Sequence, residues 1–344
     1  MTGPRQRVTP TATLVLRADA PREQWLTARR ELIGSSDVAD IVGVGYNSAR
    51  HVYYQKRGDL PLDEEIGEAA LWGNLHEETV AREWARRNNS AVQRVGLVAN
   101  LERPWMGATL DRRVPGGLCP DLARLSGPTA RIGGSVCCLE VKTRNAYVAG
   151  KWRRGVPDDV HAQALWQKMT TGLDHVHVAC LIGGSDFRQY TVRADEDLER
   201  RLLSAVELFR VDLARGVPPP IQEEVDPDRY MELEARLHPN REGTAHLGDK
   251  DALEAFELMR SYRMSHKVAD AHERSKKRDR NRLVELLGGR DSAVVDNELI
   301  YTYDEQNQAP SVDLAALAER FPEAYAACVT PKKGRRLLIK WKGE

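Results

Sequence analysis

The sequence predicts a mixed α/β fold, of the α/β or α+β class, in which a mixed central β-sheet is flanked by helices. Helical and strand patterns alternate along residues 1–220. The strand patterns at 175–182 and 187–193 follow each other closely and resemble a hairpin. Apolar residues make up 41% of the 344-residue chain and charged residues 30%, which permits a sizeable core.

The elements of the first part follow from their periodicity and from their end signals. Apolar spacing predicts helices, and Ser35 or Ser36 is a capping residue for the second of them. We expect helices at residues 22–32, 36–43, 48–57, 64–87, 157–171 and 195–214. Runs of apolar and β-branched residues predict strands at 92–99, 105–111, 136–143, 175–182 and 187–193.

A proline-rich stretch, "RGVPPPIQEEVDPD" at residues 215–228, indicates a domain boundary. Three consecutive prolines end a helix and favour extended backbone. We therefore predict domains at 1–220 and 221–344. The second domain is expected to be a smaller α+β extension whose pattern indicates no function. Its predicted elements are a helix at 250–287, a strand at 294–304, a helix at 312–327 and a last strand in "RRLLIKW".

The composition predicts a cytoplasmic protein with no membrane partner. No apolar run approaches the roughly 20 residues that span a bilayer. The N-terminal segment lacks an apolar core of signal-peptide length. The five cysteines include no C-x-x-C pair, which is typical of reduced thiols. This spacing argues against a zinc or iron–sulfur site built on cysteine.

The charge pattern leaves nucleic-acid binding open. The formal net charge is zero, but a local basic groove suffices to bind phosphates. Residues 267–282 hold seven Lys and Arg side chains against three acids. On a long helix such a run is more often a solvated face than a binding surface.

The predicted strand "CCLEVKT", residues 137–143, carries an acid and a base side by side. Alternation places Glu140 and Lys142 on the same face as Cys138, while the apolar residues between them point the other way. Alone, this pair is weak evidence of function, because an exposed ion pair is common and contributes only about 0.2–1 kcal/mol.

A second acid could join this pair. Asp111 ends the predicted strand "PWMGATLD", and a Gly- and Pro-rich loop would allow a hairpin that brings Asp111 next to Glu140. Two converging carboxylates repel each other unless a cation lies between them, and such oxygen ligands suit Mg²⁺ or Mn²⁺. Lys142 could orient or deprotonate a water, or neutralise a phosphate. This set predicts metal-assisted phosphodiester hydrolysis.

Two helices add polar candidates. Glu77 shares a mostly apolar stripe with Val80 and Trp84, where an unpaired acid is costly and a metal would relieve the cost. It could equally reach solvent from the edge of the stripe. Gln163 and Gln167 lie four residues apart on one helix face, a spacing that is uninformative by itself.

In chain order, five segments within about residues 25–195 resemble the YqaJ family of phage-type exonucleases, which belongs to the PD-(D/E)XK nuclease superfamily. Each segment is weak alone, and their order makes the resemblance specific. It implies a restriction-endonuclease-like core in residues 1–220. The segments are "WLTARRELIGSSDVADIVG", "WGNLHEETVARE", "GATLD", "LEVKT" and "HAQALWQKMTTGLDH".

The resemblance implies a metal site and an acidic neighbour. Asp111 and Glu140 would bind Mg²⁺, or Mn²⁺ as a substitute, with help from the backbone carbonyl of Val141. Glu77 would complete the acidic site, directly or through water.

The resemblance also implies roles for the side chains around the metal. Lys142 would activate or position the attacking water, and Gln163 would position that nucleophile or orient Lys142. Arg29 and Ser36, seven residues apart, would hold the 5′-terminal phosphate of DNA together with Thr109. The predicted helix start near Ser36 agrees with this role, because free N–H groups there favour an anion.

The sequence departs from the family pattern before the metal-binding Asp. Leu110 replaces the family's Pro, and Thr109 replaces its Ser but keeps a hydroxyl. A literal Pro-Asp pair also occurs in "CPDLAR", which makes Asp121 a rival ligand. We prefer Asp111 because it ends a predicted strand, whereas Asp121 is expected in a loop.

The function implied by the resemblance is a Mg²⁺-dependent exonuclease that digests the 5′-ended strand of linear duplex DNA. The remaining 3′ single strands would serve annealing-type phage recombination in a bacterial host, with a phage or prophage gene as the source. Implied partners are duplex DNA with a free 5′ end, a single-strand annealing protein, and further copies in a homo-oligomeric ring. Two alternatives remain: an endonuclease or nickase on the same core, and a non-cleaving DNA-binding recombination factor that uses residues 267–282.

Overall fold

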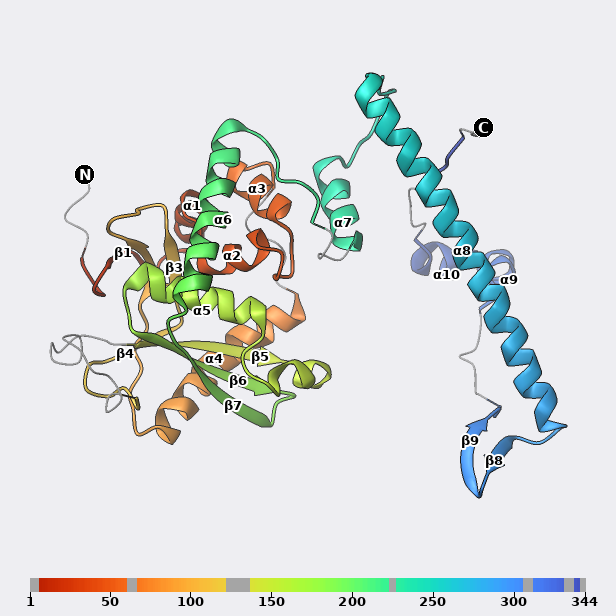
Figure 1. The fold of residues 1–344 in the computed structure, drawn as a ribbon, viewed down its shortest axis with the longest axis horizontal. Coiled ribbons are helices and arrows are strands. Elements are labelled where there is room, and N and C mark those ends of the chain that lie inside the picture. The colour runs from red at the N-terminus through yellow and green to blue at the C-terminus, as the bar shows by residue number, and fades with distance from the viewer. Residues whose placement is uncertain are drawn as a thin grey trace. The chain divides into compact units, whose positions relative to one another are not determined.

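The computed structural model describes residues 6–60, 67–121, 137–222, 227–305, 312–330 and 337–340 (Figure 1). The chain divides into two compact units, Met1–Arg241 and Glu242–Glu344.

Helices of the first unit agree with the periodicity of the sequence, except for two that the pattern did not indicate. The unpredicted helices are the 3₁₀ helix η3 and helix α7. The predicted start of the long helix at residue 64 lies outside the described residues. The helices are α1 (Arg22–Glu31), α2 (Ser35–Ile41), α3 (Ala49–Arg57), α4 (Glu68–Arg87), η3 (Ala146–Trp152), α5 (Asp158–Thr171), α6 (Glu196–Arg215) and α7 (Pro227–Leu237).

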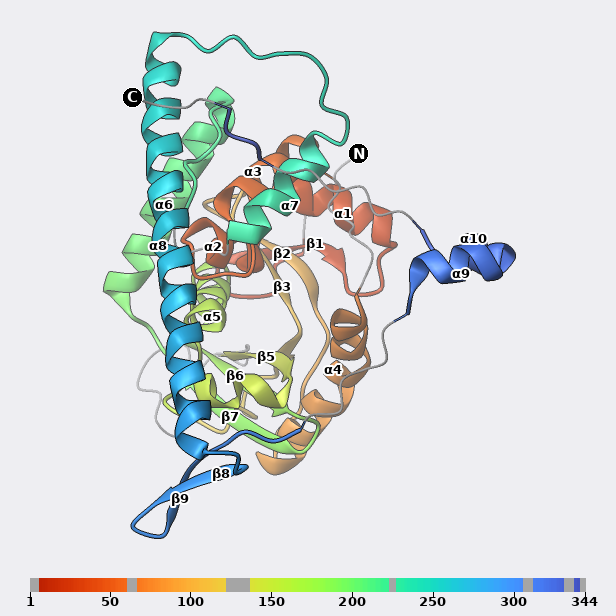
Figure 2. The same ribbon diagram turned by 90° about the vertical axis from the view of Figure 1, so that its right-hand side faces the viewer.

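The strands of this unit form two sheets, and the predicted mixed α/β class is confirmed. An antiparallel sheet has the order β1-β2-β3, and a mixed sheet has the order β4-β5-β6-β7 with β5 and β6 parallel. Helix α5 covers one face of the mixed sheet and α4 covers the other (Figures 1 and 2). The strands are β1 (Ala12–Arg17), β2 (Gly96–Asn100), β3 (Gly107–Leu110), β4 (Arg112–Val114), β5 (Cys137–Arg144), β6 (His175–Ile182) and β7 (Asp186–Val192).

The chain passes from one sheet to the other at Asp111. Strand β3 pairs with β2, and β4 pairs with β5 so that Arg112 lies opposite Leu139. The predicted hairpin between 105–111 and 136–143 is therefore wrong in one detail: the residues after Asp111, not those before it, pair with β5. The carboxylate of Asp111 still contacts β5, because Asp111 lies between β3 and β4, where the chain passes from one sheet to the other.

The proline-rich segment packs against helix α3. The backbone carbonyl of Pro219 accepts a hydrogen bond from Arg50 Nε (2.6 Å), and Gln222 Oε1 accepts one from the N–H of Ala49 (2.7 Å). Helix α7 follows, and its Tyr230 hydroxyl bonds to Arg50 Nη1 (3.2 Å). These contacts keep the chain beyond residue 220 in the first unit, so the division after Arg241 comes later than the boundary predicted from the prolines.

The second unit contains a 39-residue helix and short elements after it. The predicted strand at 294–304 is a hairpin, because Asp296 and Asn297 adopt positive φ angles of 49° and 65° and turn the chain. The predicted helix at 312–327 divides at Pro322, which starts a new helix. The elements are α8 (Asp249–Leu287), β8 (Ser292–Val295), β9 (Glu298–Thr302), α9 (Leu314–Arg320) and α10 (Pro322–Cys328).

Two further features of this unit bear on the predictions. The described part of the expected last strand, residues 337–340, is not in a strand. All seven basic side chains of residues 267–282 are exposed on α8, as expected of a solvated face. Throughout the described helices of the chain, none combines the length and the apolar character needed to cross a membrane.

Candidate active site

Strand β5 presents Glu140 and Lys142 on one face, as alternation predicts. Glu140 is only 2% exposed, and its Oε1 lies 2.5 Å from Lys142 Nζ. Burying a carboxylate costs several kcal/mol unless its oxygens are paired. The ammonium group of Lys142 therefore offsets the cost of placing Glu140 inside the protein.

Two glutamines of α5 complete the pairing of Glu140. Gln163 Nε2 donates to Glu140 Oε1 (2.7 Å), while Gln163 Oε1 accepts from Lys142 Nζ (2.9 Å). Gln167 Nε2 donates to Glu140 Oε2 (2.6 Å) and to the backbone carbonyl of Thr109 (3.2 Å). The sequence reasoning gave no role to Gln167. The signals for it are its distance of four residues, about one helical turn, from Gln163 and its place in the segment "HAQALWQKMTTGLDH".

Asp111 meets β5 beside Glu140. Its Oδ2 accepts a hydrogen bond from the backbone N–H of Val141 (2.8 Å). Burial raises the pKa of Asp111 well above its usual range, the negative charges of Glu140 and Glu77 raise it further, and Lys142 opposes them. The structure thus brings Asp111, Glu140, Lys142 and Gln163 together.

Glu77 lies at the edge of this group with a partner that the sequence did not reveal. Its Oε1 lies 2.5 Å from Nη1 of the buried Arg112, and its side chain is 31% exposed. Arg112 Nη2 also contacts Glu78 Oε2 (2.7 Å). Glu77 is therefore not left unpaired on the apolar stripe, because β4 supplies its counter-charge.

The donor set fits a small, hard divalent cation. Asp111 and Glu140 offer carboxylate oxygens, which Mg²⁺ and Mn²⁺ prefer. Glu140 Oε1 already accepts two contacts, and Oε2 accepts one. A carboxylate offers about four lone pairs, so one lone pair of Glu140 remains for a metal ion. Gln167 Oε1 is buried and accepts no hydrogen bond from any described residue. A metal-bound water would satisfy this oxygen.

Asp121, the rival ligand, lies on the opposite face of the mixed sheet. Its Oδ2 is 2.7 Å from Arg193 Nη2 and 3.4 Å from Thr191 Oγ1. Thr191 lies opposite His177 in the sheet, and His177 lies opposite Leu139, so these side chains share the face that Glu140 does not use. This geometry favours Asp111 over Asp121.

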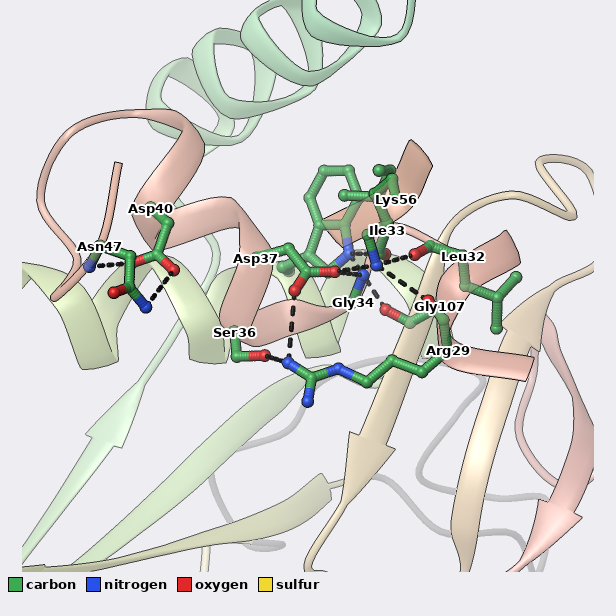
Figure 3. Close-up of polar contacts among 11 residues, drawn as sticks. Arg29, Leu32, Ile33, Gly34, Ser36, Asp37, Asp40, Asn47, Lys56 and Gly107 are labelled. Carbon is green, nitrogen blue, oxygen red and sulfur yellow. Dashed lines mark hydrogen bonds and ion pairs between the residues drawn. The ribbon is translucent and has the colours of Figure 1, made fainter. Parts of the chain in front are cut away.

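The structure also brings together Arg29 and Ser36 (Figure 3). Arg29 Nη2 donates to Ser36 Oγ (2.7 Å) and lies 3.3 Å from Asp37 Oδ1. Asp37 is buried and also accepts from Lys56 Nζ (2.6 Å), which donates in addition to the carbonyls of Arg29 and Leu32. Burial alone would raise the pKa of Asp37, but the charges of Lys56 and Arg29 outweigh it and lower that pKa.

Helix α5 connects the group around Arg29 and Ser36 to the carboxylates. Trp166 Nε1 donates to the carbonyls of Ile33 and Gly107, both at 3.2 Å, which fixes the segment before α2 against the start of β3. The next residue, Gln167, bonds to Glu140 and to Thr109. Thr109 lies on β3 two residues before Asp111. One helix therefore holds both groups of predicted site residues.

Asp40, on the same helix as Ser36, gives this region a pH dependence (Figure 3). Burial raises the pKa of Asp40 to about 6, against the hydrogen bond from the N–H of Asn47 (2.9 Å). Because the unfolded value is about 3.9, the folded state loses stability as the pH rises from about 4 through about 6. We expect Asp40→Asn to raise the free energy of unfolding near pH 8 by about 1–3 kcal/mol.

Urea unfolding of both proteins at two pH values checks this expectation. The variant and the wild-type protein should converge as the pH falls below about 4, where Asp40 becomes protonated in both the folded and the unfolded state. A stability difference that does not change with pH would contradict the assignment to Asp40.

Comparisons with known proteins identify a family whose model matches the part of the chain that carries the ordered motifs. The family model of the YqaJ-like viral recombinase domain matches residues 24–174. The uncharacterised protein YqaJ of Bacillus subtilis (strain 168) is 26% identical over 232 residues, which are 64% of this chain and 67% of that protein.

Among solved structures, two of one alkaline exonuclease show a partial likeness to this chain. The alkaline exonuclease of Laribacter hongkongensis is 18% identical and covers 62% of this chain and 97% of its own, with a TM-score of 0.44. Its complex with dAMP gives a TM-score of 0.45 at the same identity and coverage.

The family match spans all the site residues that the sequence predicts, from Arg29 to Gln163. It rests on the same part of the chain that carries the ordered motifs. The resemblance found in the sequence is confirmed: residues 24–174 match the family model of the YqaJ-like viral recombinase domain.

Proposed function

We propose that this protein is a deoxyribonuclease that needs a divalent metal ion and digests the 5′-ended strand of linear duplex DNA. The digestion would leave 3′ single strands. The observation that carries the proposal is the buried group of Asp111, Glu140 and Lys142, linked by Gln163, within a YqaJ-like domain.

The reaction is hydrolysis of a phosphodiester. A water attacks the phosphorus, the bond from phosphorus to the 3′ oxygen breaks, and that oxygen takes up a proton. Mg²⁺ held by Asp111 and Glu140, with the carbonyl of Val141, would polarise the phosphate and favour ionisation of the water. Lys142, beside Glu140 and Gln163, would orient the water and place a positive charge near the phosphate.

The glutamines act as positioning residues for Glu140. Gln163 and Gln167 donate to different oxygens of the carboxylate and so fix its plane. They carry no charge and therefore leave the negative charge of Glu140 available to a cation. A site whose groups are held in place before binding loses little free energy in reorganisation.

Arg29 and Ser36 support the direction of digestion. A guanidinium group suits phosphate because it offers several N–H donors in a fixed plane. The Lys56–Asp37 pair keeps Asp37 in place, and Asp37 in turn orients Arg29. We propose that Arg29, Ser36 and Thr109 receive the 5′-terminal phosphate, while Glu77, paired with Arg112, completes the acidic edge.

The wider setting is proposed from the family resemblance. The protein would act in the cytoplasm of a bacterial host as part of phage or prophage recombination. It would form a homo-oligomer, with a ring as the expected shape, and would deliver its 3′ strands to a single-strand annealing protein.

Purified protein with Mg²⁺ tests the proposal on labelled DNA. We expect a 5′-phosphorylated linear duplex to release its 5′ label early as a mononucleotide and its 3′ label late. EDTA should stop the reaction, because the carboxylates of Asp111 and Glu140 need the cation. Covalently closed circular DNA should stay intact.

The Asp111→Asn protein, purified in the same way, controls for contaminating nucleases. Cutting of the closed circle by the wild-type protein and not by this variant would favour an endonuclease or nickase. Retention of DNA without cleavage in Mg²⁺ would favour a non-cleaving recombination factor.

A further inference from the structure

The face of the mixed sheet opposite Glu140 carries a buried cluster of cysteine and histidine. Cys119 lies after β4, Cys137 begins β5, and His175 and His177 lie at the first and third positions of β6. All four side chains are buried, and their sulfur and nitrogen ligand atoms lie within 4.8 Å of one another. The cluster is formed by three separate segments of the chain.

Two of the distances within this cluster match the edges of a tetrahedral metal site, and the third, between the two histidine nitrogens, is slightly shorter. His175 Nε2 lies 3.0 Å from His177 Nε2, and Cys119 Sγ lies 3.3 Å from the first and 3.6 Å from the second. Zinc bonds of about 2.3 Å to sulfur and about 2.0–2.1 Å to nitrogen give tetrahedral edges of about 3.3–3.8 Å. Cys137 Sγ lies within 4.8 Å of these three atoms, so all four are grouped closely enough to ligate one ion.

The outer nitrogen of each histidine ring is already engaged. His175 Nδ1 lies 2.8 Å from the carboxylate of Asp174, which accepts, so this nitrogen carries the hydrogen. His177 Nδ1 lies 3.2 Å from Thr191 Oγ1, whose own hydrogen can go to Asp121 (3.4 Å). In neutral rings both Nε2 atoms then present lone pairs to the same point.

A metal ion at this point would stabilise the arrangement. In neutral rings, two facing lone pairs at 3.0 Å repel each other in this buried site, where the ring of Trp84 lies beside that of His177. Metal-binding histidines almost always donate their other nitrogen to a carboxylate, a carbonyl or a water, as His175 does here. We propose that Cys119, Cys137, His175 and His177 bind one Zn²⁺ ion in a closed, structural site.

The chemistry of the donors selects zinc over the cation of the nuclease site. Thiolate and imidazole in a four-ligand set suit Zn²⁺, whereas Mg²⁺ prefers oxygen. The site would fix the segment after β4 and the start of β5 to β6. Asp121, the alternative ligand for the nuclease metal, would then support the zinc site instead. It accepts a hydrogen bond from Thr191, which contacts His177.

The expectation that the cysteines disfavour zinc rested on the absence of a C-x-x-C pair. That criterion does not apply here, because each cysteine comes from a different segment. A local signal did exist in "HVHV": two histidines separated by one residue on a strand point to the same face.

The wild-type protein provides the first test. It would be expressed with added zinc, purified under reducing conditions, dialysed against Mg²⁺, and analysed for metal by mass spectrometry. We expect about one zinc ion per chain, with X-ray absorption giving both sulfur at about 2.3 Å and nitrogen at about 2.0–2.1 Å. This measurement stands even if the variants fail to fold.

Matched variants locate the ion. Cys119→Ser and His177→Asn should lose zinc, whereas Cys180→Ala, which changes another buried cysteine of β6, should keep it. Glu140→Gln should also keep zinc, because it changes only the other face of the sheet. Zinc-free wild-type protein that fails to bind added Zn²⁺, zinc lost only in Glu140→Gln, or a Cys119–Cys137 disulfide in the purified protein would each overturn the proposal.

Discussion

Lys142→Met is expected to lower the rate of DNA cleavage by about 10²–10⁴-fold, the usual range for losing a group that assists proton transfer. Methionine keeps most of the volume of lysine but carries no ammonium group. The contacts from Nζ to Glu140 Oε1 (2.5 Å) and to Gln163 Oε1 (2.9 Å) disappear with it. The water loses its positioning group and the phosphate loses a nearby positive charge.

A measurement of metal binding distinguishes the role of Lys142 from that of the carboxylates. Removing the positive charge of Lys142 leaves Glu140 more attractive to a cation, so Lys142→Met should still gain thermal stability on addition of Mn²⁺. Glu140→Gln should lose both cleavage and that gain, because a carboxamide is a weaker ligand. The assay therefore records initial cleavage rates and Mn²⁺-dependent melting temperatures for both variants.

Lys168→Met is the matched control. Lys168 lies on α5, is 15% exposed where Lys142 is 17% exposed, and pairs with Glu199 at 3.0 Å outside the site. It should retain cleavage. Full activity of Lys142→Met, or an equal loss in Lys168→Met, would remove Lys142 from the proposed chemistry.

The part of the site that the sequence could predict is the part with local causes. Alternation along β5 is a property of any strand, so it places Glu140 and Lys142 on one face without further information. Helical spacing does the same for Gln163 and Gln167. Predicting which residues of each pair share a face requires only that their own strand or helix is assigned correctly.

The remaining part depends on pairings between distant segments. Strand β4 has only three residues, "RRV", and its charges give no strand pattern, yet it pairs with β5 and brings the buried Arg112 to Glu77. The cysteine and histidine cluster likewise requires β5 and β6 to lie in parallel register. No local pattern contains that information.

Turn chemistry explains one error in the second unit. The pattern at 294–304 predicts one strand, but this segment contains Asp296 and Asn297, which both adopt a positive φ angle. Asp and Asn tolerate this conformation better than most residues and favour two-residue hairpin turns. Asp296-Asn297 is therefore the signal that favours a hairpin over the single strand that the apolar residues around it indicate.

The second large effect that we expect is on the digestion of DNA with a 5′-terminal phosphate. Arg29→Ala should slow digestion of 5′-phosphorylated duplex by about 10–150-fold, since a hydrogen bond to a charged group contributes about 1.5–3 kcal/mol. On duplex with 5′-hydroxyl ends the variant and the wild-type protein should be similar, because the group that Arg29 would bind is missing. Initial rates on both substrates give the energy of coupling between Arg29 and the phosphate.

Folding is not expected to explain the loss. Asp37 keeps its contact with Lys56 at 2.6 Å when Arg29 is removed, so no buried charge is left unpaired. Arg30→Ala controls for the general loss of positive charge, because Arg30 is the exposed neighbour on α1. It should lower both rates only slightly.

The conservative variant separates charge from geometry. Arg29→Lys keeps a positive charge, but a lysine lacks the planar fork with which a guanidinium can contact Ser36 and a phosphate at once. Its preference for 5′-phosphate should therefore fall between that of the wild-type protein and that of Arg29→Ala. If Arg29→Ala loses the same factor on both kinds of end, Arg29 contributes to DNA binding in general, and the direction of digestion must come from another part of the protein.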